Sequence, residues 1–279
     1  MKGLIFDIQR SSLVDGDGVR TAVFFKGCNL RCGWCHNPEG IDKAPRLLYY
    51  KSRCIGCGAC SAACKRADDE CSLCGECAVV CPQNARMACG REYGEAELLD
   101  IICRDTDLYL ATDGGVTFSG GECMLQIDFL ERMLCLCRER GINTAVDTAG
   151  NVPREYFERI IPYVNTFLFD VKCANGDLHR RFTGVENSLI LENLEYLCKE
   201  GCEVVARVPV IGGFNAEKGE MNRIFELLRD KGVKKAELLP YHRLGEHKYE
   251  GIGLTPRAEF FAPSASQMEK FKRMLGETL

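Results

Sequence analysis

The chain reads Phe25-Lys26-Gly27-Cys28-Asn29-Leu30-Arg31-Cys32-Gly33-Trp34-Cys35-His36-Asn37-Pro38 directly after a strand-like run at residues 21–25. The Cys-x3-Cys-x2-Cys spacing allows three thiolates to bind one iron–sulfur cube, whereas a cluster that only carries electrons normally takes four. An iron without a protein ligand can bind a small molecule directly. The spacing therefore predicts a reactive metal site on Cys28, Cys32 and Cys35.

A zinc or disulfide cluster is the alternative for this stretch. Zinc takes a fourth ligand in a closed site. His36 directly follows Cys35, so it is poorly placed to supply that ligand. We therefore favour the iron–sulfur site.

Length and charge limit the class of protein. The 279 residues suffice for one large or two ordinary domains, at roughly 150 residues per domain. A net charge of −4 provides no basic field for nucleic acid or an anionic membrane. Residues 1–6 lack the sustained apolar region of a signal peptide, and no later run is long enough to span a bilayer. We expect a cytoplasmic protein.

Nineteen cysteines in such a chain do not indicate a secreted disulfide framework, because the cytosol keeps thiols reduced. So many free thiols are typical of an anaerobe. Eleven cysteines fall into regular patterns, and we expect most of the others to be small buried hydrophobic residues. These others are Cys89, Cys103, Cys123, Cys135, Cys137, Cys173, Cys198 and Cys202.

Two further cysteine runs follow the first one. They are Cys54-x2-Cys57-x2-Cys60-x3-Cys64 and Cys71-x2-Cys74-x2-Cys77-x3-Cys81-Pro82. Both match the bacterial ferredoxin run, in which the fourth cysteine binds the other cluster. This crossing predicts one cluster on Cys54, Cys57, Cys60 and Cys81, and a second on Cys71, Cys74, Cys77 and Cys64. A pair of zinc sites is the alternative, which the repeated four-cysteine pattern disfavours.

The segment that carries these runs has few apolar side chains between its cysteines. Cluster binding should therefore supply most of its folding free energy. We interpret residues 47–90 as a small ferredoxin-like domain, inserted between residues 1–46 and residues 91–279, which form the two parts of a larger domain.

Strand and helix patterns alternate in the larger part of the chain. We expect strands at residues 21–25, 116–118, 143–146, 166–169, 203–210 and 235–239. We expect helices at residues 95–104, 124–140, 188–200 and 217–231, and from Pro153 and near Ser266. In the helix at residues 124–140, Leu125, Phe129, Met133 and Leu136 share one face.

Six strand–helix units predict an α/β fold with a parallel sheet and outer helices. The length favours a partial (β/α)6 barrel of the TIM type, and no Gly-x-Gly-x-x-Gly follows the first strand to favour a flat dinucleotide-binding sheet. Chemistry in such barrels takes place at the carboxyl ends of the strands, where the polar motifs of this chain lie.

The sequence Gly120-Gly121-Glu122 follows the second expected strand. Two residues without Cβ allow a ligand to approach the backbone, and the carboxylate can accept a hydrogen bond from an ammonium group. A plain turn is the alternative.

Further polar residues follow the later strands. Asp147, Thr148 and Asp170 offer hard oxygen atoms for a cation, a ribose or an amino group, and surface or capping roles stay equally open. Lys172, Arg207 and His242 suit the carboxylate, ribose or adenine of a ligand, although each can equally be a satisfied polar group of the barrel.

The cysteine motif at residues 28–35 resembles the signature of the radical S-adenosylmethionine (SAM) enzymes, and the ordered set of motifs along nearly the whole chain resembles the glycyl radical enzyme activating enzymes. The set comprises Phe6-Asp7-Ile8-Gln9, Asp15-Gly16-x-Gly18-x-Arg20-Thr21, the cysteine motif with Asn37-Pro38-Glu39, the ferredoxin-like insert, Thr117-x-Ser119-Gly120-Gly121-Glu122, Asp170-Val171-Lys172, Arg207-x-Pro209-x-Ile211 and Leu238-Leu239-Pro240-Tyr241-His242-x2-Gly245-x2-Lys248-Tyr249. Asp17 and Cys123 stand where the family commonly has proline.

The resemblance implies reductive cleavage of SAM and hydrogen abstraction from the Cα of one glycine in a partner enzyme. It implies that residues 15–20 contact the glycine loop of the partner, and that Asp147, Thr148 and Asp170 hold a monovalent cation. The residues it implies for the SAM site are Trp34, Cys35, His36, Gly121, Asp170, Val171, Lys172 and His242.

The resemblance also implies the partners. The insert is typical of activators of dehydratases, decarboxylases or lyases and is missing from the short pyruvate formate-lyase activators. We expect three [4Fe–4S] clusters, a reduced flavodoxin or ferredoxin as electron donor, and a monomer when the protein is free.

Two other functions stay open at this point. One is an electron-transfer protein, which the three-cysteine site argues against. The other is a radical SAM enzyme that acts on a peptide or small molecule. Complete four-cysteine ligation of both auxiliary clusters disfavours a direct role for them in binding such a substrate.

Overall fold

The computed structural model describes residues 1–64 and 71–279. The strands are β1 (Lys2–Ser12), β2 (Arg20–Phe25), β3 (Arg46–Tyr49), β4 (Arg86–Cys89), β5 (Arg91–Gly94), β6 (Gly115–Gly120), β7 (Asn143–Thr148), β8 (Thr166–Asp170), β9 (Val204–Val210) and β10 (Lys235–Pro240). The helices are α1 (Ala59–Ala62), α2 (Glu76–Val79), α3 (Glu95–Cys103), α4 (Thr106–Thr112), α5 (Ile127–Glu139), α6 (Arg154–Ile160), α7 (Gly176–Thr183), α8 (Ser188–Lys199), α9 (Lys218–Asp230), α10 (His247–Gly251) and α11 (Ala265–Thr278).

The main sheet has the strand order β10-β9-β8-β7-β6-β2-β1-β5. From β2 to β10 all neighbouring strands are parallel, whereas β1 pairs antiparallel with both β2 and β5. The six expected strands are thus the six parallel ones, and they are arranged in chain order. The predicted α/β class with a mostly parallel sheet is confirmed.

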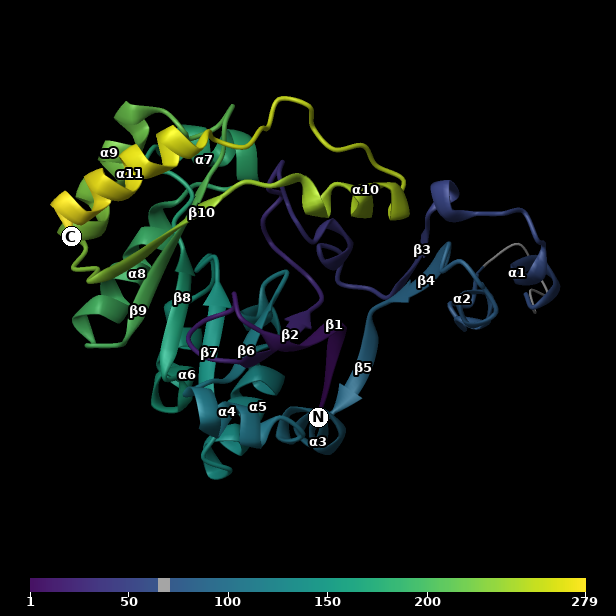
Figure 1. Cartoon of the computed structure of the whole chain (residues 1–279). Coiled ribbons are helices and arrows are strands. Elements are labelled where there is room, and N and C mark those ends of the chain that lie inside the picture. Colours follow the sequence, from purple (N-terminus) through teal and green to yellow (C-terminus); the bar gives the residue numbers. More distant parts are fainter. Residues whose placement is uncertain (65–70) are drawn as a thin grey trace.

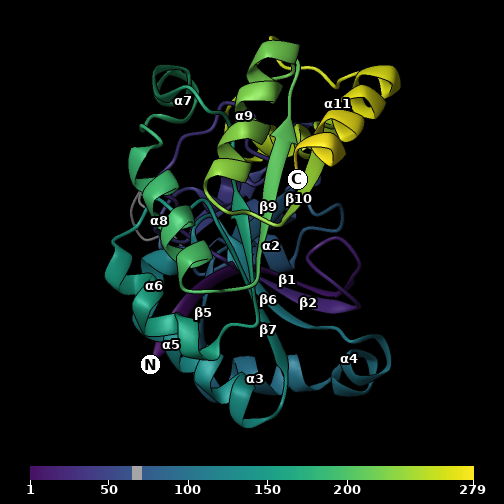
Figure 2. The same cartoon turned by 90° about the vertical axis from the view of Figure 1, so that its left-hand side faces the viewer.

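The larger helices lie along the outside of this sheet (Figures 1 and 2). Helix α5 packs on α3 and α6, α6 packs on α8, and α9 packs on α11. Because α3, α5, α6, α8 and α9 each fill a connection between parallel strands, they come to lie on the same outer face, and α11 joins them there after β10. No helix of the described part of the chain combines the length and hydrophobicity that crossing a bilayer requires.

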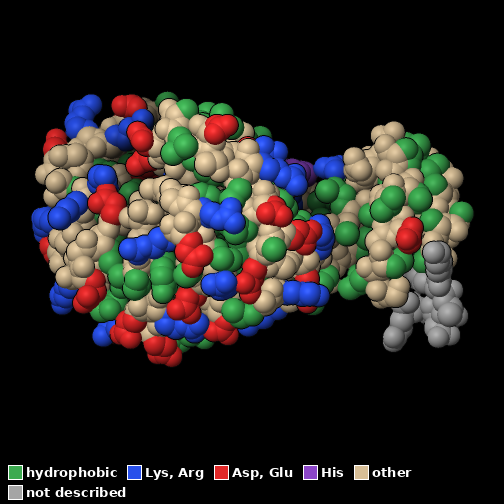
Figure 3. Space-filling view, turned by 90° about the horizontal axis from the view of Figure 1, so that it is seen from below, with side chains coloured by type: hydrophobic (Ala, Val, Ile, Leu, Met, Phe, Trp, Pro, Cys, Tyr) green, Lys and Arg blue, Asp and Glu red, His purple; other side chains and the backbone are tan. Residues whose placement is uncertain are grey.

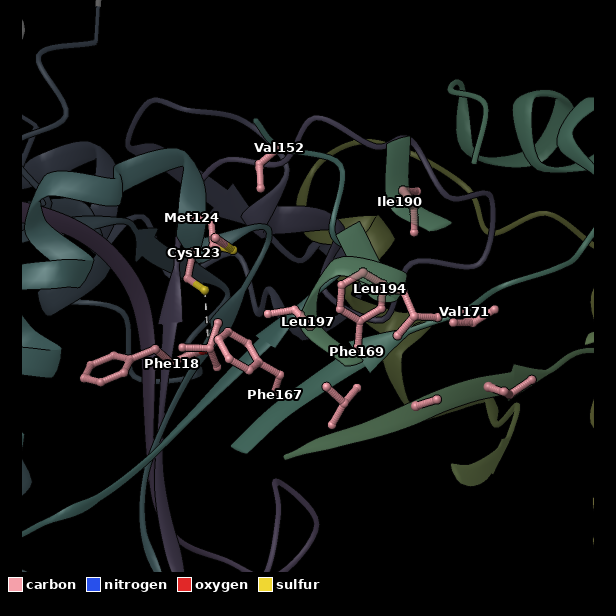
Figure 4. Close-up of a cluster of buried hydrophobic side chains, with 14 of the residues drawn as sticks. Phe118, Cys123, Met124, Val152, Phe167, Phe169, Val171, Ile190, Leu194 and Leu197 are labelled. Atoms are coloured by element: carbon pink, nitrogen blue, oxygen red, sulfur yellow. Dashed lines mark hydrogen bonds between the residues drawn. The ribbon is translucent and has the colours of Figure 1, made fainter. Parts of the chain in front are cut away.

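The core lies between the sheet and these helices (Figure 4). Phe118 of β6 is fully buried there, with its ring centroid 6.0 Å from that of Phe25 of β2 in an edge-to-face arrangement. Phe167 and Phe169 of β8 extend the same layer toward Leu194 of α8. Side chains of a strand alternate between its two faces, so the residues between these aromatic ones lie on the opposite face.

That opposite face is apolar at one end and polar at the other. Ala145, Leu168 and Val205 form a small buried cluster of their own. Toward the carboxyl ends of the strands, the same alternation places on this face Ser119, Asp147, Asp170, Arg207 and Glu237. The sheet therefore gathers charged side chains from neighbouring strands on one surface.

Several elements differ from the sequence-based expectation. The expected helix at residues 124–140 begins as a 3-10 helix over Cys123–Gln126, and α5 follows. The buried face of α5 is centred on Phe129, Leu130 and Met133, whereas Leu125 and Leu136 are only partly buried. Pro153 lies at the N-cap, one residue before α6.

Strands β1 and β5 and helices α4 and α7 were not expected. In β1 only Gly3 and Ile5 are buried, so the strand lacks a regular alternating pattern. The other three elements span eight residues or fewer. Segments this short seldom show a clear period in sequence.

Strands β3 and β4 form a separate two-stranded sheet. Helices α1 and α2 lie on the segment between them, beside the main body in Figure 1 and as a distinct lobe in Figure 3. No residue of 51–64 or 71–84 is buried. Each helix is preceded by a glycine with positive φ, Gly58 at 74° and Gly75 at 79°, so the two cysteine runs adopt the same turn.

We predict that Phe118→Ala lowers the free energy of unfolding by about 3–5 kcal/mol, because it removes a fully buried ring between β6 and its neighbours. Leu110→Ala, on the exposed side of α4, should change it by less than about 0.5 kcal/mol. Urea unfolding followed by circular dichroism measures both values. Equal losses in the two variants would contradict this placement of the core.

Candidate functional site

The loop with Cys28, Cys32 and Cys35 follows β2 and is held by backbone hydrogen bonds on two sides. The Gly27 amide donates to the Gly40 carbonyl over 2.7 Å, and the Arg31 amide donates to the Thr183 carbonyl over 2.7 Å. The loop is thus fixed between the 3-10 helix at Pro38–Gly40 and the end of α7. Its three cysteines are half-buried and form no disulfide.

Trp34 holds the cysteine loop through aromatic packing. Its ring is buried, with the centroid 4.2 Å from that of Phe214 and 5.5 Å from that of Phe260. Because aromatic packing surrounds the ring, the side chain serves to hold the loop. Its contact with SAM stays a prediction.

Burial raises the pKa of the Cys28 and Cys35 thiols to about 12, and it also raises the pKa of Cys32. Metal binding therefore has to displace protons here. The Lys172 ammonium counteracts the effect of burial, because its charge favours the thiolate forms of Cys28 and Cys32. A set of three thiols with a nearby fixed cation fits the charge of an anionic iron–sulfur cluster.

The Gly120-Gly121-Glu122 turn pairs with the start of the cysteine loop. The Gly121 amide donates to the Phe25 carbonyl and the Glu122 amide to the Gly27 carbonyl, both over 2.8 Å. A Cβ on Gly121 would lie 2.2 Å from the Gly27 oxygen, and Gly120 has a φ of +123°. The space that the glycines leave is therefore filled by the cysteine loop itself.

The Glu122 carboxylate is buried and hydrogen-bonded within the protein. The Thr148 hydroxyl lies 2.9 Å from both carboxylate oxygens, and the amides of Ala149 and Met124 donate over 3.0 and 3.2 Å. Burial raises the pKa of Glu122 to about 7, despite these donors. The carboxylate is thus held rigidly between the turn and the end of β7.

Asp147 and Arg207 meet on the polar face of the sheet. Ser119 donates to Asp147 over 2.6 Å, and Arg207 Nη1 lies 3.8 Å from Asp147 Oδ2. Burial raises the pKa of Asp147 to about 6. Burial alone would lower the pKa of Arg207, but Asp147, Asp170 and Glu237 outweigh it and hold the pKa above its ordinary value.

Asp170 and Lys172 form an ion pair at the end of β8, with 2.5 Å between Nζ and Oδ2. Although burial acts in the other direction, Asp170 and the nearby cysteines hold the pKa of Lys172 above its ordinary value. Val171, between the two, donates its amide to the Arg207 carbonyl over 2.8 Å. Lys172 is therefore a permanent positive charge beside the cysteine loop.

The predicted cation site is only partly assembled by these contacts. Asp147 and Asp170 are close enough to influence each other, but the Thr148 hydroxyl is directed at Glu122. Among residues 1–64 and 71–279, no three His, Cys, Asp or Glu side chains gather around a single metal ion. The cation at Asp147, Thr148 and Asp170 stays a prediction.

His36 and His242 stack at the rim, with 4.3 Å between their ring centroids. Burial lowers the pKa of His36 to about 4, so its ring is neutral at physiological pH. His36 Nε2 is buried without a hydrogen-bond partner among the described residues, whereas His242 is exposed. The pair brings the loop and the segment after β10 together.

The loop between β1 and β2 closes over the polar face. The Val14 carbonyl accepts from Arg207 Nη2 over 2.8 Å, and the Asp15 carbonyl accepts from Thr117 over 2.6 Å. Arg20 is buried and its Nε donates to Thr117. Leu13 and Val14 project outward, with exposed fractions of 75% and 78%, so they rather than Arg20 are available to a partner.

Sequence reasoning gave no role to α10, which holds the cysteine loop and the insert together. Tyr249 donates to the Cys35 carbonyl over 3.0 Å, and Lys248 donates to Asn37 over 2.6 Å. On the same helix, Glu250 accepts from the Ser52 hydroxyl over 2.6 Å. The sequence shows the Lys-Tyr pair but has no signal for a contact across 214 residues.

Two cavities lie in the lobe of α1 and α2. The smaller, of about 280 Å³, is lined by Cys54, Cys57, Cys60 and Cys81. The larger, of about 380 Å³, is lined by Cys64, Cys71, Cys74 and Cys77 and is also touched by Cys60. Each cavity thus contains one of the two four-cysteine sets that the ferredoxin crossing predicts.

The scattered cysteines divide equally. Cys89, Cys123, Cys137 and Cys173 are buried, and Cys103, Cys135, Cys198 and Cys202 are half-buried. Cys123, in place of the common proline, donates weakly to the Phe118 carbonyl, with 3.4 Å between sulfur and oxygen (Figure 4). It lies in the core and not in the site.

Comparison with known proteins gives consistent results. Residues 79–234 match the model of the radical SAM superfamily, and residues 68–87 match that of the 4Fe-4S binding domain. The trans-4-hydroxy-L-proline dehydratase activating enzyme of Clostridioides difficile is 37% identical, covering 98% of this chain and 96% of its own. The choline trimethylamine-lyase activating enzyme of Oleidesulfovibrio alaskensis is 39% identical, covering 90% of this chain and 87% of its own.

A solved structure supports the fold. A radical SAM methyltransferase from Sphaerobacter thermophilus superposes with a TM-score of 0.58 at 17% identity, covering 99% of this chain and 71% of its own. The similarity concerns the arrangement of the sheet and helices.

We predict that stability decreases between about pH 5 and pH 7.5 and that Glu122→Gln reduces the decrease. Because burial raises the pKa of Glu122 to about 7, the folded state holds a proton that the unfolded chain has already lost above its ordinary pKa of 4.5. The stabilisation is therefore full below about pH 4.5 and is lost as the pH rises through 7. It is of the order of 3 kcal/mol, since one pKa unit corresponds to about 1.4 kcal/mol.

Urea unfolding of the cluster-free protein at several pH values measures this effect. Asp147 contributes in the same direction, so the Gln variant should keep part of the slope. Glu192→Gln, on the exposed side of α8, should keep all of it. Identical slopes for Glu122→Gln and the unchanged protein would contradict the burial of an uncharged Glu122.

Proposed function

Because this chain belongs to the glycyl radical enzyme activating enzymes of the radical SAM superfamily, we propose that it activates a glycyl radical dehydratase, lyase or decarboxylase. Cys28, Cys32 and Cys35 would hold a [4Fe–4S] cluster, which would supply the electron for cleavage of SAM and so the radical that takes a hydrogen atom from a glycine Cα of the partner. The observation that carries the proposal is the three-cysteine loop hydrogen-bonded to the Gly-Gly-Glu turn.

Within this function, the residues of the chain bind and orient SAM. Lys172 and Arg207 supply fixed positive charge for its carboxylate. Glu122 can accept from its amino group, and three internal donors already hold the carboxylate in place. Gly120 admits the loop, and His36 and His242 close the rim. Asp147, Thr148 and Asp170 remain the candidates for a monovalent cation.

We propose that the parallel strands form a partial (β/α)6 barrel, interrupted by a ferredoxin-like domain at residues 47–90. Six parallel strands in sequential order support the barrel. Pairing of β3 with β4 closes the ends of the insert, and β5 then returns the chain to the main sheet beside β1. Residues 1–46 and 91–279 are therefore two parts of one domain.

We propose three [4Fe–4S] clusters, of which two are auxiliary. The two cavities support the auxiliary pair, because their linings separate the eight cysteines into the crossed sets. The absence of buried residues in 51–64 and 71–84 supports folding around clusters, since this part of the lobe has no core of its own.

The surface that we propose for binding the partner is the exposed loop between β1 and β2. Val14 is exposed and its carbonyl accepts from Arg207, which in turn faces Asp147, so a glycine loop that docks there would reach the polar face of the sheet. The dehydratase and lyase activators among the relatives support a partner of these classes. A reduced flavodoxin or ferredoxin is the proposed donor, and a cytoplasmic monomer is the proposed free state.

We predict that the reduced protein converts SAM to 5′-deoxyadenosine and methionine, and that Cys32→Ala lowers the rate to background. The variant removes one of three ligands, which leaves the cluster without its site. Cys135→Ala, in a half-buried position on α5 outside the motifs, should retain the rate. Chromatography of both products measures it. Full activity of Cys32→Ala would exclude the Cys28/Cys32/Cys35 site as the origin of the cleavage, and no cleavage by the unchanged reduced protein would favour a purely electron-carrying protein.

We predict that Cys54→Ala and Cys71→Ala each reduce the glycyl radical yield in the partner at least tenfold, with Cys198→Ala as the unaffected control. SAM cleavage, measured separately, distinguishes the causes. If cleavage falls as well, the lobe passes electrons inward. If only the radical yield falls, the lobe shapes the docking surface. Unchanged values for both quantities would contradict either role.

A further inference from the structure

Arg86 lies between the two cavities of the insert. It is the first residue of β4, and it lines both cavities. No other Lys, Arg, Asp or Glu among the described residues lines either of them. The lobe therefore contains one fixed positive charge that both cavities share.

The position of the guanidinium is determined by the small sheet. Arg86 pairs in register with Tyr49 of β3, and its Cζ lies 4.7 Å from the centroid of the Tyr49 ring. A cation over an aromatic face is attracted to it, so the side chain is held against the ring. Its Nε is buried and has no hydrogen-bond partner among the described residues.

The cysteines around Arg86 belong to both proposed cluster sites. Cys60 lines both cavities together with Arg86, and Cys77 lines the larger of the two. Cys60 belongs to one crossed set and Cys77 to the other. The guanidinium is thus placed to act on both proposed clusters.

We propose that Arg86 raises the reduction potentials of both auxiliary clusters and so makes the pair a sink for electrons from an external donor. This inference rests on the proposed auxiliary clusters. A cube with four thiolates is an anion that gains one more negative charge on reduction, so a nearby cation stabilises the reduced form more than the oxidised form. Net charge and hydrogen bonds to sulfur are general determinants of cluster potentials.

Arg53 provides a matched control. It also stacks on a tyrosine of this region, with Cζ 4.2 Å from the centroid of the Tyr50 ring. It is exposed and lines neither cavity. Removing its charge changes the net charge of the lobe by the same amount as Arg86→Gln does, at a side chain that lines neither cavity.

Potentiometric titration followed by electron paramagnetic resonance tests the proposal. The full chain with Cys32→Ala serves as background, because it retains only the auxiliary pair. We expect Arg86→Gln to lower the ratio of reduced to oxidised auxiliary cluster at a fixed potential about tenfold, equivalent to about 59 mV for a one-electron couple. Arg86→Lys should restore most of the difference, and Arg53→Gln should leave the potentials unchanged.

Iron analysis separates failure of the inference from failure of the cluster assignment. The background protein should contain about eight iron atoms per chain, four for each cube. A lower number overturns the auxiliary pair and the inference with it. About eight iron atoms in Arg86→Gln with unchanged potentials overturn only the role of Arg86. If Arg86→Gln does not bind both clusters, Arg86→Met removes the charge with a side chain of similar length, and about eight iron atoms with unchanged potentials in that variant overturn the role equally.

Discussion

The fold and the site depend on one short backbone contact, in which the turn after β6 pairs with the first residues of the cysteine loop. Two hydrogen bonds of 2.8 Å join Gly121 and Glu122 to Phe25 and Gly27. A side chain at position 121 would prevent this approach. Because the same turn carries Glu122, one contact fixes both the loop that we propose for the metal cluster and the carboxylate that we propose for SAM. Because β2 and β6 are neighbouring parallel strands, the turn and the loop that follow them begin side by side.

The polar face of the sheet holds carboxylates around the buried Arg207 side chain. Asp170 and Glu237 flank Arg207 in register on the neighbouring strands, and Asp147 approaches it from β7. Buried charges are costly unless they are paired, so the arrangement depends on all of its members. Lys172 forms an ion pair with Asp170, so the network of charges extends to the cysteine loop. Binding of an anionic group beside Lys172 and Arg207 therefore meets charges that the fold has already oriented.

The sequence was sufficient for the six parallel strands, because all of them end at a motif and all but β10 have a buried run. It was also sufficient to place the polar motifs at one end of the sheet. It was insufficient where local pattern is weak, as in β1, or where a contact is long-range, as between Tyr249 and Cys35. The two glycines at 120 and 121 show a different limit: their motif is visible, but the neighbour that requires them is the protein's own loop rather than a ligand. Thr148 likewise forms a contact with Glu122 that no spacing rule reveals.

Helix α10 has a consequence for biosynthesis. The Glu250 carboxylate accepts a hydrogen bond from the amide of Ser52, which lies 198 residues earlier in the chain. At the usual 5–20 residues per second, the insert leaves the ribosome roughly 10–40 s before its docking residue is made. The lobe is therefore synthesised before its attachment to the main sheet can form, and the distance between the cysteines of the lobe and Cys35 is fixed only after α10 has been made.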